Sequence, residues 1–397
     1  MQDAPLAGIR VIAVEQYGAG PFGSMQLADM GAEVIKIENP AAGGDVARKS
    51  GPFFLGDNDS EFFQTFNRNK KSLTLDLKHP EGRAAFERLV QSADVVTNNL
   101  RGDLPARLGL DYASLGKLKP SIICGHLSAY GRDNDRASWP GYDYLMQAEA
   151  GFMDLTGEPG TPPARFGLSM VDFTTGTTLS MAVLGALVGV LRGGRGRDVD
   201  VSLFDVALTQ LTYPATWYLN RAHAVGRVPR SGHPSVTPCQ IYRTSDGWIF
   251  VMAMTEKFWQ ALVRGLERAD LLDDTRFAGV DARREHRDLL TEILDAEFQR
   301  QPTQAWISRF AGELPIAPVN TLPQALDNRW LAASGMLQAL PHVDNSHFTV
   351  LASPLKFDGK RPAGKGCSAL GADNESLLAE LGYSADEIEA LRSLEVV

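Results

Sequence analysis

The sequence predicts a protein of the α/β class, with a doubly wound parallel sheet in a large domain and a smaller α+β domain attached to it. In the first third of the chain, short runs rich in Val and Ile alternate with helical patterns, and strands that alternate with helices form parallel sheets. A later hairpin pattern followed by helices indicates the second domain. The chain has 397 residues, of which 44% are hydrophobic, so it can bury more than one core.

The elements of the large domain follow from local patterns. Helices are expected at 22–30, which ends before Gly31, and at 80–92, where Pro80 suits the first turn. The chain after the small domain adds a strand-like stretch and a terminal amphipathic helix. The strand-like runs of the first third are residues 10–15, 33–38, 72–77, 93–97 and 121–125, and the two late elements are 347–351 and 384–394.

The small domain is marked by a hairpin at 241–251, with its turn at Asp246-Gly247. Helical patterns follow at 256–267 and 282–300, and a Gly-, Pro- and Arg-rich loop precedes the hairpin. The expected domains are 1–220 with 325–397 for the large one and 225–320 for the small one, with linkers near 205–228 and 318–328.

The composition excludes several classes of protein. The formal net charge is −9 without a basic tract, so nucleic acid and anionic membranes are not expected as partners. Residues Met1–Pro5 lack the pattern of a secretory signal, and the longest apolar run, 179–191, is too short to span a bilayer, so we expect a cytoplasmic protein. Cys124, Cys239 and Cys367 are far apart, which predicts buried thiols and no metal site.

A glycine motif near the N-terminus favours one alternative. Gly18-Ala19-Gly20-Pro21-Phe22-Gly23 fits G-x-G-x-x-G between a strand and a helix, and Glu38 follows twenty residues after Gly18. These features are typical of a Rossmann-like dinucleotide site. Pro21, however, removes a backbone N–H that a phosphate would need, and Glu15 would repel a pyrophosphate. An NAD(P)-binding protein therefore stays a remote alternative.

Asp172 is the candidate catalytic residue. It precedes the apolar run 179–191, which predicts a helix that ends at Arg192-Gly193-Gly194. If Thr174 or Thr175 caps this helix, Asp172 lies about one turn ahead of its N-terminus, where the helix dipole favours an anion. An ionised carboxylate in that position can act as a nucleophile toward an activated carbonyl. The alternative is that Asp172 only caps the helix.

Several segments together resemble the class III CoA-transferase family (CaiB/BaiF), the group of formyl-CoA:oxalate and carnitine CoA-transferases. Their order and spacing along nearly the whole chain carry the resemblance. The segments are Pro5–Ile12, Gly18–Pro21 with the A-G-P turn, Gly31–Glu38, Asn67–Ser72 with N-x-N-K-x-S, Pro140–Asp143 with P-G-Y-D, Asp172 in x-D-x-x-x-G, Gly194–Leu203 and Glu395–Val397.

The resemblance implies an interlocked homodimer that transfers CoA from an acyl-CoA donor to a small carboxylic acid, with Asp172 as the nucleophile. CoA thioesters would then be substrates, and no tightly bound cofactor or metal is expected. By position, the contacts to CoA would come from Gly18, Leu75, Lys78, Asn99, Leu100, Arg101, Arg107, Gly141, Tyr142 and Asp143. The Lys and Arg residues among them suit the phosphates of CoA.

The substrate and one rival reaction remain open. Region 225–245 resembles family members that use dicarboxylates, and Arg48, Arg68 and Arg165 are candidates to hold a second carboxylate. An α-methylacyl-CoA racemase shares the implied fold, but it uses a His where this chain has Tyr142, and a neutral phenol is a poor base near pH 7. We also keep His126 as a possible substitute base and a non-catalytic CoA-binding protein as a further alternative.

Overall fold

The computed structural model describes residues 4–342 and 345–397 of the chain. Residues 1–3, on which the predicted absence of a secretory signal partly rests, lie outside them. The chain forms two compact units, one made of residues 1–150, 167–211 and 329–397 and the other of 151–166 and 212–328. The second unit includes residues 151–166, which the sequence placed in the large domain. The predicted domain boundaries and linkers stay a prediction.

Within the described residues, six strands form a parallel sheet in the first unit. Their spatial order, β5-β2-β1-β6-β7-β8, corresponds to the order 3-2-1-4-5-6 along the chain, which is that of a doubly wound Rossmann-like sheet. The α/β prediction is confirmed, although the sixth strand was not predicted. The bounds are β1 Arg10–Val14, β2 Glu33–Glu38, β5 Lys70–Thr74, β6 Val95–Asn98, β7 Ile123–Ser128 and β8 Arg197–Ser202.

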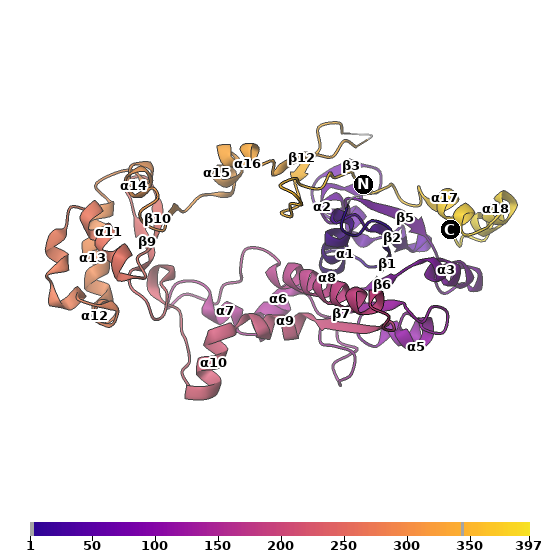
Figure 1. Ribbon diagram of the computed structural model, residues 1–397, viewed down its shortest axis with the longest axis horizontal. Helices are drawn as coiled ribbons and strands as arrows, with labels where there is room; N and C mark the ends of the chain where they lie inside the picture. The colour runs from indigo at the N-terminus through magenta and orange to yellow at the C-terminus, as the bar shows by residue number, and fades with distance from the viewer. Residues whose placement is uncertain (1–3, 343–344) are drawn as a thin grey trace. The chain divides into compact units, whose positions relative to one another are not determined.

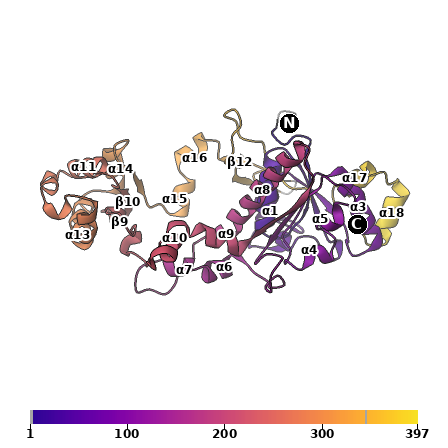
Figure 2. The ribbon, with the colours of Figure 1, turned by 60° about the horizontal axis from the view of Figure 1, so that its bottom comes forward.

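Helices cover both faces of this sheet (Figure 2). On one face lie α3 (Pro80–Ser92), α17 (Asn374–Glu380) and α18 (Ala385–Ser393), whose apolar side chains share one core with the strands. On the other face lie α1 (Ala19–Asp29) and α8 (Met170–Leu191). Helices α17 and α18 belong to the part of the chain that follows the small domain. The C-terminal tail therefore completes the core of the first unit (Figure 1).

The backbones of α1 and α8 touch at two glycines. A Cβ atom on Gly23 would lie 2.6 Å from the carbonyl oxygen of Gly176, and a Cβ on Gly176 would lie 2.4 Å from the carbonyl oxygen of Ala19. Both distances are too short for any side chain. The hydroxyl of Ser180 also donates a hydrogen bond of 2.8 Å to the carbonyl of Gly23. The spacing between the two helices is therefore set by the absence of side chains.

Helix α8 is longer than the sequence predicts, with 22 residues from Met170 to Leu191. Among the described residues it is long and apolar enough to cross a membrane by length and composition alone, so the prediction that this run is too short was wrong. The same test is passed by core helices of soluble proteins, and it is weak evidence. Leu179, Val183 and Leu187 of α8 are buried.

The second unit contains the predicted hairpin. Strands β9 (Cys239–Arg243) and β10 (Trp248–Met252) are antiparallel, and β11 (Ile316–Pro318) pairs with the other edge of β10. The turn is closed by a hydrogen bond of 3.0 Å from the N–H of Thr244 to the carbonyl of Gly247. The core of this unit is aromatic, with Trp259, Phe298 and Trp306 buried.

Both predicted helical regions of the second unit are helical, and its described residues contain four further α-helices that were not predicted, α7, α10, α14 and α15. The expected helix 282–300 is divided at His286 into α12 and α13. The helices of this unit are α7 Phe152–Leu155, α10 Thr212–Arg221, α11 Glu256–Gly265, α12 Val280–Glu285, α13 Arg287–Phe298, α14 Thr303–Phe310 and α15 Leu322–Leu326.

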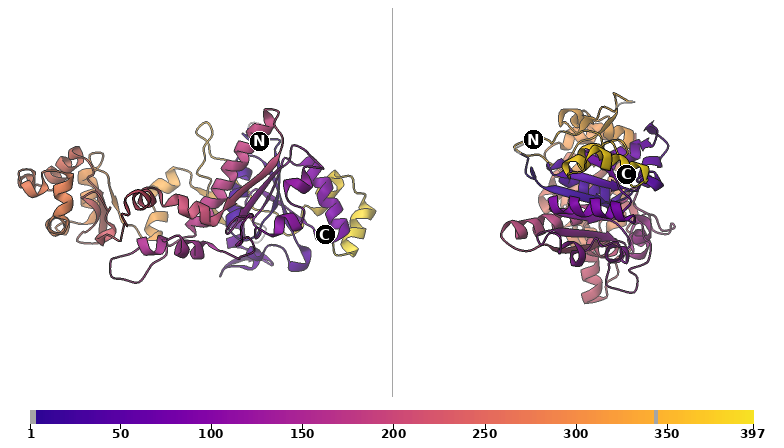
Figure 3. Two further views of the ribbon diagram at one scale, coloured as in Figure 1. Left: turned by 90° about the horizontal axis from the view of Figure 1, so that it is seen from below. Right: turned by 90° about the vertical axis from the view of Figure 1, so that its right-hand side faces the viewer.

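The remaining elements of the first unit are short. The C-terminal helices, drawn in yellow in Figure 3, also belong to this unit. The predicted late strand is present as β13, paired with β12, and the terminal helix α18 begins with a capping box formed by Ser384 and Glu387. These elements are α2 Glu61–Asn67, α4 Leu104–Arg107, α5 Tyr112–Leu115, α6 Asp143–Glu149, α9 Leu203–Gln210, α16 Arg329–Ala333, β3 Phe54–Gly56, β4 Asp59–Ser60, β12 Leu337–Ala339 and β13 Thr349–Leu351.

The glycine contact predicts a stability effect. Gly176→Ala should lower the free energy of unfolding by about 1–3 kcal/mol, because the added methyl group would force the two helices apart. Gly226→Ala is the control, since a Cβ there would meet no atom within 4 Å. It should change the free energy of unfolding by less than about 0.5 kcal/mol. Denaturant unfolding measures both variants, and equal stability of the two would contradict the contact.

Candidate active site

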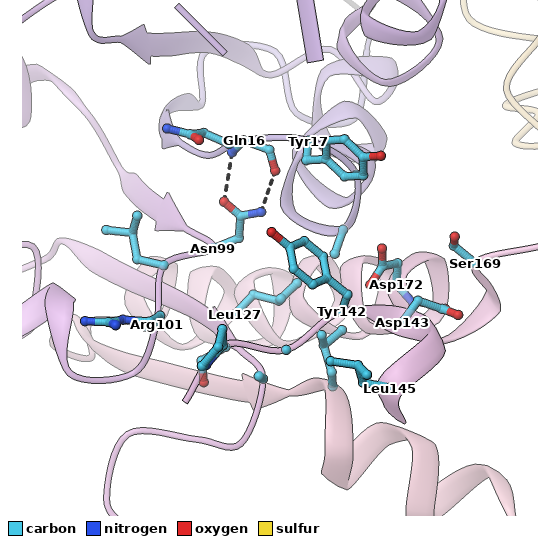
Figure 4. A pocket seen from close by; sticks show the side chains of 18 of the residues that line it. Gln16, Tyr17, Asn99, Arg101, Leu127, Tyr142, Asp143, Leu145, Ser169 and Asp172 are labelled. Carbon is cyan, nitrogen blue, oxygen red and sulfur yellow. Dashed lines mark hydrogen bonds between the residues drawn. The ribbon is translucent and has the colours of Figure 1, made fainter. Parts of the chain in front are cut away.

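A pocket of about 830 Å³ lies at the carboxyl ends of β1 and β6 in the first unit. These two strands are neighbours at the centre of the sheet, where the strand order reverses, and such switch points are the usual ligand sites of open α/β sheets. The two loops are joined at this place: the N–H of Gln16 donates to Asn99 Oδ1 at 2.8 Å, and Asn99 Nδ2 donates to the carbonyl of Gln16 at 2.6 Å (Figure 4).

Asp172 lines this pocket from the first turn of α8. The residue is 9% exposed, and none of the described residues donates a hydrogen bond to its carboxylate oxygens. Gly18, the N-cap of α1, is its neighbour, since a Cβ there would lie 3.5 Å from Asp172 Oδ2. The carboxylate thus lies beside the N-terminal ends of two helices, where the dipoles favour an anion.

The predicted capping of α8 was wrong. The helix begins at Met170, so Asp172 lies inside its first turn and not one turn ahead of it. The hydroxyls of Thr174 and Thr175 donate to carbonyls one turn earlier within the helix, each at 2.7 Å, and therefore cap nothing. A first-turn N–H of α8 is satisfied instead by a side chain of another helix: the backbone N–H of Asp172 donates to Asp143 Oδ2, in α6, at 3.0 Å.

Asp143 fixes Asp172 and also changes its proton affinity. Asp143 is buried, and its other carboxylate oxygen accepts a hydrogen bond of 2.5 Å from Gln147 Nε2. Burial, and secondly the negative charge of Asp143, raise the pKa of Asp172 from its ordinary 3.8 to about 7. At pH 7 about half of the Asp172 carboxyl groups are therefore ionised, and the ionised form can act as a nucleophile.

The N-x-N-K segment holds both ends of α1. Lys70 Nζ donates to the carbonyl of Pro21 at 2.8 Å and to Asn67 Oδ1 at 2.9 Å. Arg68 forms a buried ion pair of 2.6 Å with Asp29 in the last turn of α1. The motif therefore acts on the site indirectly, by fixing the helix whose N-terminus lies beside Asp172.

Tyr17 adopts an unfavourable backbone conformation at the mouth of the pocket. Its φ is 69°, in the left-handed region that non-glycine residues rarely adopt. The N–H of Tyr17 donates to Asp45 Oδ1 at 3.0 Å, and Asp45 is held by a buried ion pair of 2.7 Å with Lys36. The strain at Tyr17 is thus maintained by a buried charge pair, as is common at functional sites.

Most of the predicted CoA contacts lie together. The three that do not line the pocket have evident reasons: Leu75 is in the core, Lys78 is exposed, and Arg107 is exposed and bonded to Asp103. The predicted residues that line the pocket are Gly18, Asn99, Leu100, Arg101, Gly141, Tyr142, Asp143 and Asp172.

Several lining residues were not predicted. Gln16 and Tyr17 lie in the loop that follows β1, and their position beyond the carboxyl end of a central strand was a signal that could have found them. Trp139, Leu145 and Ser169 have no such signal in the sequence, because their place depends on how α6 and α8 meet.

Two of the three arginines suggested for a second carboxylate are committed elsewhere. Arg48 is buried in a bidentate pair with Glu38, and Arg68 is paired with Asp29, so neither lines the pocket. Arg165 lies in the second unit. Arg101 is the positively charged side chain among the described residues that line the pocket. Its Nη2 lies 3.2 Å from Asp103 Oδ2.

His126 does not act as a base in this pocket. Its Nδ1 is 2.8 Å from Asn98 Nδ2 and its Nε2 is 2.8 Å from Asp198 Oδ1, so both ring nitrogens are used within the buried sheet. Among the described residues, no group of three or more His, Cys, Asp or Glu side chains could hold a metal ion. Cys124, Cys239 and Cys367 are free and buried, as predicted.

Comparison with known proteins gives the family. The model of CoA-transferase family III matches residues 6–374, so the chain belongs to this family and is a CoA-transferase. The chain is 34% identical to the succinate–glutarate CoA-transferase of Agrobacterium fabrum over 393 residues, which cover 95% of this chain and 96% of that protein.

Two further relatives agree. The succinyl-CoA:glutarate CoA-transferase of Mus musculus is 30% identical, with 98% of this chain and 89% of that protein covered. The crystal structure of a CAIB/BAIF family protein from Brucella suis is 31% identical and superposes with a TM-score of 0.82, with 96% of this chain and 100% of that chain covered. The family model and the two CoA-transferases do not favour the racemase alternative.

The raised pKa of Asp172 predicts a pH-dependent effect on stability. The folded state binds the proton of Asp172 more tightly than the unfolded state does. The free energy of unfolding of wild type therefore falls as the pH rises from about 4 to about 7, and this loss of stability stays constant above pH 7. Asp172→Asn cannot ionise. At pH 8 it should therefore be more stable than wild type by on the order of 1–4 kcal/mol, since a tenfold change in proton affinity corresponds to about 1.4 kcal/mol.

Thermal or denaturant unfolding at pH 5 and pH 8 measures this difference, which should be smaller at pH 5. Asp57→Asn replaces an exposed carboxylate and is the matched control. An advantage of Asp172→Asn that is the same at both pH values would contradict the raised pKa.

Proposed function

We propose that this enzyme transfers CoA from an acyl-CoA donor to a small dicarboxylic acid, with Asp172 as the covalent nucleophile. One observation carries the proposal: the Asp172 carboxylate is buried, lacks a hydrogen-bond donor among the described residues, and lines the pocket at the switch point of a CoA-transferase fold. A helix cap would have its carboxylate bonded to backbone N–H groups, so the capping alternative is not supported.

The reaction proceeds through two kinds of covalent intermediate. An Asp172 oxygen attacks the acyl carbonyl of the donor, the C–S bond breaks, CoA leaves as the thiolate, and an aspartyl–acyl anhydride forms. The thiolate then attacks the Asp172 carbonyl carbon and releases the donor acid as a carboxylate, which leaves an aspartyl-CoA thioester. The acceptor carboxylate attacks this thioester, and the same steps in reverse give the new acyl-CoA and free Asp172.

The surrounding groups have separate tasks in this scheme. Asp143 holds the backbone of Asp172 and keeps the pKa of its carboxyl raised. The backbone N–H groups of Ala19 and Gly20, in the first turn of α1, are suitable donors for the oxyanions that form during acyl transfer, because the first N–H groups of a helix have no partner within it. Arg101 and Asp172 lie toward opposite ends of the pocket with Tyr142 between them, which suits a CoA phosphate at one end and the thioester at the other (Figure 4).

The dicarboxylate class of substrate is supported by the relatives. The proteins from Agrobacterium fabrum and Mus musculus are named for succinate or succinyl-CoA and glutarate, and they match this chain over nearly its full length. We extend the same substrate class to this enzyme.

No observation favours the racemase reaction, since Tyr142 stands where the His of a racemase is expected. The cytoplasmic location stays a prediction.

The enzyme is proposed to act as an interlocked homodimer. Helix α8 exposes large apolar side chains on one side, with Met181 66%, Val188 52% and Leu191 74% exposed. Apolar surface of this kind marks an interaction site.

Static light scattering should give twice the mass of one chain for the wild-type protein. Met181→Glu should reduce the measured mass toward that of a single chain. A monomeric wild-type protein would contradict the proposal.

The function is tested by mass spectrometry of CoA esters after incubation in D₂O. Succinyl-CoA and an α-methylacyl-CoA would be supplied together with a pool of free short dicarboxylates. New CoA esters of the added acids are expected, and they would name the acceptor. A gain of one mass unit on the α-methyl ester without new esters would show the racemase instead.

Substitution of the nucleophile separates chemistry from binding. Asp172→Asn and Asp172→Ala should lower exchange by at least about 10³-fold, because the covalent route is removed. CoA should still bind to both variants, as measured by calorimetry, because the contacts at the Arg101 end of the pocket are unchanged. Exchange that survives either substitution would show that another residue is the nucleophile.

A further inference from the structure

Gly18 differs from the other two glycines of its segment. A Cβ on Gly20 would lie 2.8 Å from Asn99 Cβ, and a Cβ on Gly23 would lie 2.6 Å from the carbonyl oxygen of Gly176. Both positions therefore exclude side chains because of packing. At Gly18 the nearest atom would be Asp172 Oδ2 at 3.5 Å, which is an ordinary van der Waals distance.

The backbone at Gly18 does not require glycine either. Its φ of −118° and ψ of −69° lie where residues with side chains are found, and not in the left-handed region. Alanine fits the position without a shift of its neighbours. Neither folding nor packing therefore explains the absence of a side chain beside the candidate nucleophile.

A side chain at position 18 would occupy space inside the pocket, next to the carboxyl group of Asp172. Gly18 and Asp172 both line the pocket, and Oδ2 is the atom of Asp172 that faces Gly18. In the proposed reaction an acyl group becomes bonded to an oxygen of this carboxyl. A side chain at position 18 would therefore compete for volume with the acyl group in the anhydride, and more so the longer that acyl group is.

We infer that Gly18 is a specificity-determining residue that leaves room beside Asp172 for acyl groups longer than two carbons. This inference rests on the proposed function, and it adds the part of the molecule that sets acyl length. The selection is steric, because the positive charge among the lining residues is at Arg101, toward the other end of the pocket (Figure 4). An added methyl group should therefore matter most for the largest acyl groups.

The test uses Gly18→Ala and Gly18→Val with acetyl-, propionyl-, succinyl- and glutaryl-CoA as donors. For Gly18→Ala, the loss of kcat/KM relative to wild type should be at least about tenfold greater with succinyl- and glutaryl-CoA than with acetyl-CoA, as one methylene in a pocket is worth about 10–200-fold. Gly18→Val should enlarge this difference. Gly279→Ala, at a position without neighbours within 4 Å, should leave the whole series unchanged.

Two outcomes would overturn the inference. Equal losses with every donor would show that Gly18 serves CoA binding or folding, and unchanged rates with every donor would show that the space is not used. Thermal unfolding checks that the variants are folded.

Failure of the proposed function would look different, since wild type would then exchange CoA with none of the donors. In that case binding decides the matter. Calorimetry should show that Gly18→Val weakens the binding of glutaryl-CoA at least about tenfold more than it weakens the binding of CoA itself. Equal weakening of the two ligands would reject the steric role of Gly18.

Discussion

The contact between the backbones of α1 and α8 is the constraint on which the site depends. Gly23 and Gly176 let the two helices approach so closely that no side chain fits between them at these positions. This approach places Gly18, at the start of α1, against Asp172, in the first turn of α8. Two helix dipoles then act on one buried carboxylate, while burial and Asp143 oppose its ionisation. The pKa of Asp172 is raised to about 7 as a result, so the carboxyl is partly ionised near neutral pH.

Buried charges around the pocket keep this arrangement rigid. Lys70 and Arg68 hold the two ends of α1, and the Lys36–Asp45 pair holds the strained Tyr17. Pairs of this kind contribute little net stability, because desolvation offsets their attraction. Their value lies in position: each bonds to a backbone group or a helix end that a hydrophobic side chain could not hold. The core supplies the stability and the charge pairs supply the geometry.

The fold was largely predictable and the site only partly so. Strands rich in Val and Ile were found from sequence, whereas β8 was missed because three of its first four residues, Arg197, Asp198 and Asp200, are charged. The start of α8 was misplaced because its acceptor, Asp143, comes from a different helix and leaves no local signal. Arg48 and Arg68 were candidates for substrate binding, but their partners Glu38 and Asp29 are distant in sequence. Local patterns specify elements, and long-range contacts decide which charged groups remain available.

The glycine motif shows why a matching pattern needs a physical reason. Its three glycines fit a dinucleotide fingerprint by spacing, yet two of them are explained by close contacts with Asn99 and Gly176. Pro21 contributes a carbonyl that accepts from Lys70, in place of the N–H that a phosphate would need. Gly18 alone is free of such contacts, and it is the glycine that lies beside Asp172. The residue that packing does not explain is thus the one whose absent side chain bears on the chemistry.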